Sequence, residues 1–317
     1  AMGYQALSTD TQGSRSVALG YNALSTQNFT SATDSLNVAV GYSSGSAVTT
    51  GTNNTFVGGE SGSAVTTGEK NVALGYQALT TNVAGDQAVA IGHEALKVAN
   101  PSGNLNDTAV GFQAGVACTT GIKNVFIGST TGYNLTTGST NIYVGYNSTA
   151  SAVDITNEIV IGSNAAGGGT NTVRFQTTGG SATLGLDGSD TSWAAASDSR
   201  LKKDVASSTV GLEFIKDLRP VTFKWNAKNA VANSLPQYDA DSSDPVFGEG
   251  KAHHGFIAQE VKTVIDAHSD VVNGHNLWSV DPDGTQQVSP SALVPMLTKA
   301  IQELSEKNDA LEARLAA

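Results

Sequence analysis

The sequence has little of the chemistry on which most enzymes and nucleic-acid-binding proteins depend. Charged residues make up 14% of the 317 residues, aromatic residues make up 6%, and the formal net charge is −11. Because phosphate contacts need a basic surface, this balance argues against a nucleic-acid partner. It also argues against an anionic membrane surface, and no run of about 18 apolar residues that could span a bilayer is present. We therefore expect neither a nucleic-acid nor a membrane partner.

Metal and cofactor motifs are also missing from the sequence. The single cysteine, Cys118, cannot form an intrachain disulfide and has no second thiol or histidine at ligand spacing. We interpret it as a small buried residue. The sequence contains no phosphate-binding loop and no carboxylate pair in a setting typical of glycoside cleavage. No cofactor and no metal site are expected.

Glycine, by contrast, is abundant and regularly placed. An apolar-x-apolar-Gly motif recurs, mostly at intervals of 17 residues, with two longer intervals of 21 and 19. Its glycines are Gly3, Gly20, Gly41, Gly58, Gly75, Gly92, Gly111, Gly128, Gly145 and Gly162. A fixed period of this length is the signature of a repeat architecture. It predicts a fibrous β-roll or β-solenoid over residues 1–170.

Each repeat predicts one short strand. The residue before the glycine and the residue two positions earlier are mostly aliphatic, as in Val17 and Leu19. This period of two predicts a strand with these residues on the inward face. The residue between them, such as Ala18 or Phe126, is never charged, and we expect this stripe to form a subunit interface. One coil cannot bury its own face, so stacked coils, and three chains together, are expected to close the core.

The repeat also indicates where within a repeat unit the sequence starts. Residues 3–7 are identical to residues 75–79, so the sequence starts inside a repeat. Ala1-Met2 resembles a cloning scar, and we expect the natural protein to extend upstream. Through motifs such as residues 71–75 (Asn-Val-Ala-Leu-Gly) and 87–92 (Gln-Ala-Val-Ala-Ile-Gly), the stretch resembles the head repeats of trimeric adhesins and the shafts of phage tail fibres. The resemblance implies a homotrimer.

A change of composition predicts a domain boundary. Residues 171–196 are a Gly- and Thr-rich junction in which the period is lost. Lys and Arg number five against eleven Asp and Glu before residue 197, and twelve against seventeen after it. This rise in charge density indicates a separate domain over residues 197–317, with mixed α and β patterns.

The end of the sequence predicts a trimeric coiled-coil helix over about residues 291–317. Apolar residues recur there in steps of three and four, and one polar residue, Asn308, occupies an a position that would fix the register between chains. The seam consists of Val294, Leu297, Ile301, Leu304, Asn308, Leu311 and Leu315. The alternative is an amphipathic helix that packs on its own domain.

Residues 197–202 (Ser-Asp-Ser-Arg-Leu-Lys) carry the sharpest chemical hypothesis. Lys202 can act as a general base toward Ser197 if burial lowers the pKa of its ammonium group. A Ser and a Lys five positions apart also occur by chance, and the alternative is a solvated, charged linker.

Four motifs in residues 197–317 together resemble a known family. They are residues 197–202, residues 218–225 (Leu-Arg-Pro-Val-Thr-Phe-Lys-Trp), residues 255–261 (Gly-Phe-Ile-Ala-Gln-Glu-Val) and the terminal helix. The segment is similar to the endosialidase-type intramolecular chaperone domain of phage tailspikes and tail fibres, which also occurs in some membrane-bound transcription factors. The resemblance implies that the domain trimerises, guides the folding of the β-rich part and then releases it by self-cleavage.

The resemblance also implies roles for individual residues. Ser197 would be the nucleophile and Lys202 the base of a single-turnover autoprotease. Asp198 and Arg200 match motif positions that we assign to orienting the bond, with a local ion pair as the alternative. Attack of the Ser197 hydroxyl on the preceding carbonyl passes through a five-membered ring, which favours cleavage at Ala196/Ser197. Cleavage at Ser197/Asp198 stays open.

The expected function is the C-terminal part of a virion tail fibre, made in the host cytoplasm. Its partners would be two further copies of the chain, a released chaperone trimer and a host surface receptor, for which a glycan is one candidate. The alternatives are the distal part of a polysaccharide-degrading tailspike and a trimeric surface adhesin with an uncleaved cap. For the repeat tyrosines, such as Tyr21, Tyr42, Tyr76 and Tyr146, we favour packing between coils over stacking on sugars.

Overall fold

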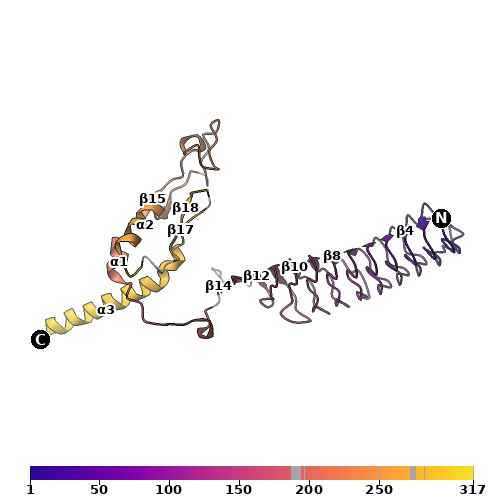
Figure 1. The fold of residues 1–317 in the computed structure, drawn as a ribbon, viewed down its shortest axis with the longest axis horizontal. Coiled ribbons are helices and arrows are strands. Elements are labelled where there is room, and N and C mark those ends of the chain that lie inside the picture. The colour runs from indigo at the N-terminus through magenta and orange to yellow at the C-terminus, as the bar shows by residue number, and fades with distance from the viewer. Residues whose placement is uncertain (187–193, 196, 249, 272–275, 282, 317) are drawn as a thin grey trace. The chain divides into compact units, whose positions relative to one another are not determined.

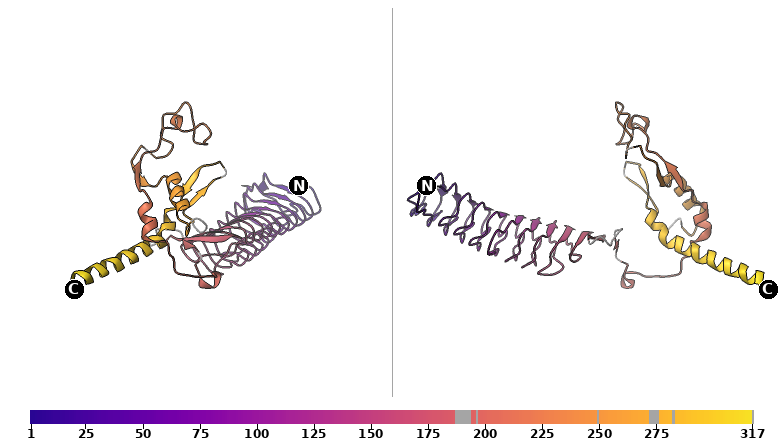
Figure 2. Two further views of the ribbon diagram at one scale, coloured as in Figure 1. Left: turned by 60° about the vertical axis from the view of Figure 1, so that its left-hand side comes forward. Right: turned by 180° about the vertical axis from the view of Figure 1, so that it is seen from behind.

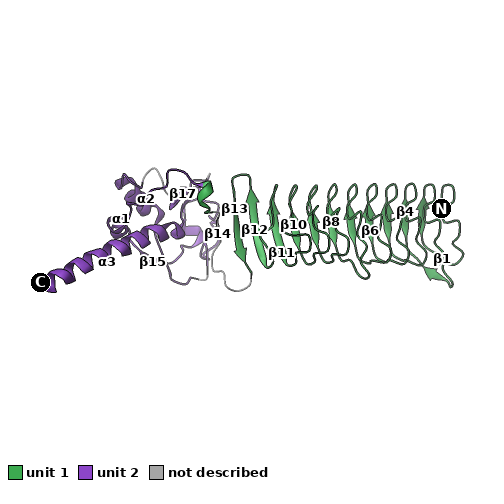
Figure 3. Cartoon of the chain, turned by 90° about the horizontal axis from the view of Figure 1, so that it is seen from below, with its two compact units in different colours: residues 1–201 green, residues 202–317 purple. Residues whose placement is uncertain are grey.

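The computed structural model describes residues 1–317 except 187–193, 196, 249, 272–275, 282 and 317. The chain forms two compact units, Ala1–Leu201 and Lys202–Ala317 (Figure 3). Their boundary lies inside the predicted cleavage motif. Each unit is described by itself.

The first unit is a β-solenoid in which each coil adds one short strand to a single sheet (Figure 1). Its coils carry β2 (Val17–Leu19), β4 (Val38–Val40), β5 (Thr55–Val57), β6 (Val72–Leu74), β7 (Val89–Ile91), β8 (Thr108–Val110), β9 (Val125–Ile127), β10 (Ile142–Val144) and β11 (Glu158–Gly162). Neighbouring strands are parallel, and Val72 faces Val89, 17 residues further on. The predicted solenoid and its period are confirmed.

Further strands flank this run at both ends. Near the N-terminus, β1 (Gly13–Ser14) pairs in parallel with β3 (Thr33–Asp34). At the other end β12 (Thr172–Thr177) adds in parallel to β11, and β13 (Gly180–Gly185) and β14 (Ala194–Ala195) continue the sheet antiparallel. The Gly- and Thr-rich stretch thus contributes a hairpin that extends the solenoid sheet.

The assignment of the two strand faces was wrong. The middle residue of every coil strand, from Ala18 to Val160, is buried inside the coil, whereas its neighbours point outward: Val17 is 51% exposed and Leu19 is 43% exposed. A period of two separates two faces but does not say which one is inside. Here both faces are apolar, so polarity alone does not distinguish them. The aliphatic residues form the outer face instead.

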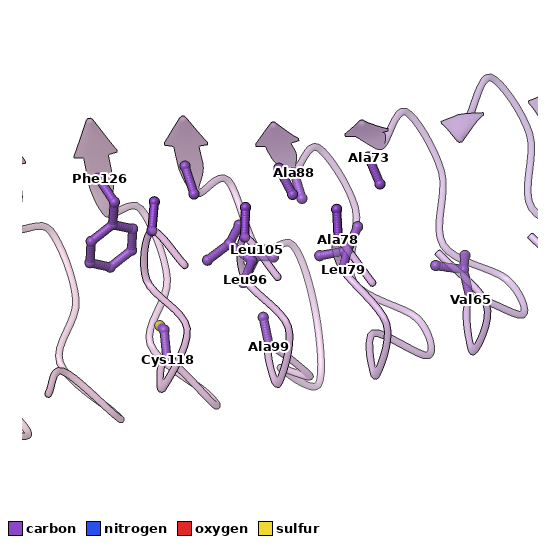
Figure 4. Packing of buried hydrophobic residues seen from close by; sticks show 14 of the residues in the cluster. Val65, Ala73, Ala78, Leu79, Ala88, Leu96, Ala99, Leu105, Cys118 and Phe126 are labelled. Atoms are coloured by element: carbon purple, nitrogen blue, oxygen red, sulfur yellow. The ribbon is translucent and has the colours of Figure 1, made fainter. Parts of the chain in front are cut away.

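Large and small residues alternate inside the solenoid so that each coil is filled. Three coils place Ala on the strand and a leucine on the opposite wall, as with Ala73 and Leu79 in Figure 4. Where Phe56 takes the strand position, Gly62 faces it, and a Cβ at Gly62 would lie 2.5 Å from the ring. This exchange keeps the packing dense along the whole unit.

A row of buried asparagines satisfies the backbone inside the coils. Asn71 is typical: its Oδ1 accepts from the Ala88 N–H at 3.0 Å, and its Nδ2 donates to the Gly85 carbonyl at 2.9 Å. The other members of this asparagine row are Asn37, Asn54, Asn124 and Asn141. Each side chain links two coils and occupies backbone groups that water cannot reach.

Asp107 occupies one position of the asparagine row. Its Oδ1 accepts from the Asn124 N–H at 2.6 Å, and its Oδ2 lies 3.7 Å from the Sγ of Cys118. Burial raises the pKa of this carboxyl to about 7, because the low-dielectric interior disfavours the charged form. The same burial raises the pKa of the Cys118 thiol. Cys118 is fully buried, as predicted.

We expect Gly75→Ala to destabilise the solenoid by about 2–3 kcal/mol. Gly75 has a φ of +135°, and a Cβ there would lie 2.5 Å from the carbonyl oxygen of Gly92 in the next coil. The clash is with backbone, which cannot rotate away. The matched control is Gly59→Ala, where a Cβ meets only the edge of the Tyr76 ring at 3.3 Å. Equal denaturant midpoints for the two variants would contradict this view of the glycine row.

The second unit is a small α+β fold that ends in a long helix. Its elements are α1 (Leu212–Asp217), β15 (Val221–Phe223), η2 (Lys228–Ala230), β16 (His253–Gly255), α2 (Ala258–Ala267), β17 (Trp278–Val280), β18 (Gln286–Val288), η3 (Pro290–Leu293) and α3 (Val294–Ala316). The strands form two antiparallel pairs, β15–β16 and β17–β18. Its core includes Phe214, Val261, Ile265 and Leu277. The predicted α+β region and terminal helix are confirmed, and Figure 2 shows the last turns of α3 extending beyond the rest of this unit.

Candidate cleavage site and chaperone domain

The predicted cleavage motif forms a short turn that Asp198 and Arg200 hold together. The 3-10 helix η1 spans Ser199–Leu201, and the Asp198 carbonyl accepts from the Leu201 N–H at 3.0 Å. The Asp198 carboxylate accepts from the Arg200 N–H at 2.8 Å and from both the Nε and Nη2 of its guanidinium at 3.0 and 2.6 Å. This guanidinium holds the pKa of Asp198 below its usual value. The local ion pair is therefore present, and a role in orienting the scissile bond stays a prediction.

Ser197 and Lys202 lie on either side of the boundary between the two units. Both belong to an exposed stretch, residues 197–209, with little regular structure apart from η1. Ala196 lies outside the described residues, and so does the Ala196/Ser197 bond. The Ser197/Asp198 bond lies in the exposed stretch. The serine–lysine dyad and the choice of bond stay predictions.

An ion pair that the sequence analysis missed connects two of the four motifs in residues 197–317. Arg219, two residues before β15, donates from Nε to the Glu260 Oε2 at 2.9 Å, and its Nη2 contacts Oε1. Glu260 lies in the first turn of α2, directly after the strand that pairs with β15. The pair lowers the pKa of Glu260. The sequence signal for this pair was weak: the first motif contains Arg219 and Lys224, and the second contains Glu260.

Beside this pair, aromatic rings gather around the β15–β16 ladder. Trp225 lies edge-on to Phe223 and to Phe247 at 5.2 and 4.9 Å, and the His253 ring lies 5.7 Å from Phe223. Phe223, Trp225 and Phe247 line a cavity of about 750 Å³, and so does the exposed His254. In the part of the chain that the structure describes, no cluster of three or more His, Cys, Asp or Glu side chains is placed to hold a metal ion.

Helix α3 uses one face to pack on its own unit. Ala300 is buried on this face, and the Glu303 carboxylate accepts from the Leu212 N–H at the start of α1 at 2.9 Å. The predicted seam lies on a neighbouring face of the helix, and its apolar residues are exposed: Ile301 is 67% exposed and Leu304 is 56% exposed. Leu297, Leu311 and Leu315 continue the same exposed face. Packing on the domain thus accounts for one face and leaves the seam uncovered. No described helix combines the length and apolar character needed to cross a membrane.

The tyrosines that follow the repeat glycines pack on one another along the first unit. The ring centroids of Tyr4 and Tyr21 lie 5.2 Å apart, those of Tyr21 and Tyr42 lie 5.4 Å apart, and both pairs are stacked. His93 stacks on Phe112 in the same way at 5.2 Å. Packing between coils, which the sequence analysis favoured, is confirmed for these rings.

Comparison with known proteins gives one match. Residues 197–270 match the family model described as chaperone of endosialidase. The matched stretch begins at Ser197 and continues just beyond α2, so it contains both the turn at Asp198 and the Arg219–Glu260 pair. A search of curated proteins and a search of solved structures returned no match to this chain.

Proposed function

Because this chain carries a C-terminal chaperone-of-endosialidase domain behind a β-solenoid, we propose that it is part of a trimeric virion fibre whose chaperone domain cleaves itself off at Ser197. Domains of this family are autocleaving intramolecular chaperones that typically act in trimeric fibres. The domain brings three chains into register while the solenoid folds. The solenoid remains as the fibre that contacts the host surface.

The exposed seam of α3 is the observation that carries the proposal. Its other face already packs against α1, so Ile301, Leu304 and Leu311 have no apolar partner within their own described unit. A row of exposed apolar residues at heptad spacing is buried when helices associate. The outer aliphatic face of the solenoid, with Val17 and Leu19, offers a second surface of the same kind. Three copies of the chain would cover both surfaces.

The cleavage step uses the Ser197 hydroxyl as an internal nucleophile. Lys202 takes the hydroxyl proton while Oγ attacks the Ala196 carbonyl carbon. It then passes this proton to the Ser197 nitrogen as the Ala196–Ser197 C–N bond breaks, which leaves an ester and a free Ser197 amine. Water then hydrolyses the ester, giving a carboxylate at Ala196 and restoring the hydroxyl. Attack at Ser197/Asp198 is the alternative.

Assembly would control the timing of this step. Lys202 is exposed in the single chain, so water solvates its ammonium group. Burial against neighbouring chains would lower the pKa of Lys202 and make it a base. Cleavage would then follow trimer formation rather than precede it.

The repeats explain why such a chain needs a chaperone. Successive coils are so similar that a strand can pair one coil out of register with little loss of contacts. A helical trimer at the C-terminus raises the effective concentration of the three chains and aligns them. Its removal after folding takes away the reverse route, so the fibre is kinetically trapped.

Denaturing gel electrophoresis with intact-mass measurement on the freshly expressed chain tests the proposal. We expect the denaturing gel to show two fragments whose common boundary lies next to Ser197. Under native conditions each fragment should have the mass of three copies. The fragment masses identify the bond. A chain that stays whole as a stable trimer would show a permanent cap and would contradict self-cleavage.

Placing a charge in the seam is expected to weaken assembly. Ile301→Glu puts three carboxylates on the proposed three-fold axis, and we expect at least a tenfold weaker trimer and a matching drop in cleavage. Ala313→Glu adds the same residue away from the seam and serves as the control. Light scattering after size exclusion gives the mass. Unchanged trimers in Ile301→Glu would show that the seam is not the contact.

A further inference from the structure

The row of aromatic side chains on the solenoid is interrupted at two coils. One residue after each repeat glycine stand Tyr4, Tyr21, Tyr42, Gly59, Tyr76, His93, Phe112, Ser129, Tyr146 and Ser163. Within the row, Tyr21 has ring neighbours at both faces, and 45% of it is exposed. Tyr42, which ends its stack at Gly59, is 59% exposed, and Tyr146, which stands between two serines, is 58% exposed. The interruptions therefore leave ring faces uncovered.

Gly59 forms the floor of a slot between Tyr42 and Tyr76. The missing ring leaves two coil steps between these tyrosines, about 10 Å at the usual strand spacing. The Tyr76 ring leans toward this floor, 3.3 Å from where a Cβ at residue 59 would lie. One flat ring fits between two aromatic walls at this spacing. Ser129, between Phe112 and Tyr146, leaves a second slot by the same arrangement.

Polar side chains lie directly beside the first slot. Glu60 follows Gly59, Gln77 follows Tyr76, and the Gln77 Nε2 donates to the Glu60 Oε2 at 2.7 Å. This pair offers a carboxylate acceptor and an amide group next to two aromatic faces. A pyranose presents the complementary chemistry, with apolar C–H faces toward the rings and hydroxyl groups toward the polar pair.

From this arrangement we propose that the slots at Gly59 and Ser129 bind neutral pyranose rings of a host surface glycan. The Glu60 carboxylate beside the first slot and the net charge of −11 disfavour sugars that carry their own carboxylate. At the usual strand spacing the two slots lie about 20 Å apart along the fibre, so one branched glycan or two neighbouring glycans can occupy both. The proposal rests on the fibre's role in host recognition and names the site and the ligand class.

Filling the slots tests the proposal without removing any residue that holds the coil together. Gly59→Tyr and Ser129→Tyr complete the aromatic row, and the φ of Gly59 lies outside the left-handed region. Thr49→Tyr adds the same ring eight residues after Gly41 on an exposed part of the coil and serves as the control. The probes are lactose, cellobiose and mannobiose, with 3′-sialyllactose as the acidic comparison.

Saturation-transfer NMR with irradiation of the aromatic protons is the measurement, made on the assembled protein. At least one neutral disaccharide should show saturation transfer at least fivefold stronger than that of the sialylated probe. In the variant with both slots filled this transfer should be at least tenfold weaker. In Thr49→Tyr it should be unchanged. The proposal is overturned if no neutral probe binds, if the filled variant still binds, or if filling the slots changes the subunit number, which would place a second copy of the chain there. Cleavage and trimer mass, measured on the same samples, report on the proposed function separately.

Discussion

Ser197→Ala is expected to leave every chain whole on a denaturing gel, under conditions in which the wild type separates into two fragments. The substitution removes the only atom that forms the ester, so cleavage should fall at least a thousandfold. Ser199→Ala is the matched control, because it removes a hydroxyl from the same exposed turn and leaves the Asp198–Arg200 contacts in place. A cleaved Ser197→Ala chain, or an uncleaved Ser199→Ala chain, would remove Ser197 from its proposed role.

Lys202→Arg extends this experiment to the base. Arginine keeps the positive charge but does not release its proton in proteins, so it cannot accept the proton of Ser197. We expect trimers of normal mass that do not cleave. Cleavage at the wild-type rate would mean that another group acts as the base.

Asp107→Asn is expected to stabilise the solenoid at alkaline pH by up to about 4 kcal/mol. The folded state holds the pKa of Asp107 near 7, well above its ordinary value of 3.8. Burying the charged form therefore carries a penalty that is absent below about pH 4 and complete above about pH 7. Wild-type stability should fall across this window, and the asparagine variant should not show this fall.

The structure also supplies the reason why asparagine fits at residue 107. The other members of the asparagine row donate to a backbone carbonyl fourteen residues further on, as Asn124 does to Gly138 at 3.0 Å. Charged Asp107 has no proton for such a bond, and its Oδ2 lies beside the Cys118 thiol instead. Melting temperatures from pH 4 to pH 9 are the measurement, and the exposed Asp154→Asn is the control. A parallel decline in wild type and Asp107→Asn would contradict the assignment.

The period of the solenoid could be predicted from the sequence, but the direction in which the strand side chains point could not. Seventeen-residue spacing of glycine is visible without any structure, because the φ and close approach at residues such as Gly75 leave no alternative. Val17 and Ala18 are both apolar, however, so the pattern of polarity does not decide which of them is inside. The same limit applies to Asn71, whose two hydrogen-bond partners become neighbours only when the coils stack.

In the second unit the sequence placed the motifs but not their contacts. Residues 218–225 and 255–261 were recognised as separate motifs, whereas the bond between Arg219 and Glu260 depends on the pairing of β15 with β16. The heptad pattern of α3 left open whether the seam faces the domain or a second copy. The hydrogen bond between Glu303 and Leu212 shows that α3 packs on its own unit through residues outside the seam.

Because the coils of the solenoid repeat one pattern, the length of the fibre can change by whole coils. Each coil pairs only with its two neighbours, so the gain or loss of one 17-residue unit rejoins strands that match as well as before. A duplication or deletion within the gene would then lengthen or shorten the reach of the fibre by about 5 Å per coil. The interruptions of the aromatic row would travel with their coils: loss of residues 59–75 would bring Tyr42 directly against Tyr76 and erase a slot in a single event.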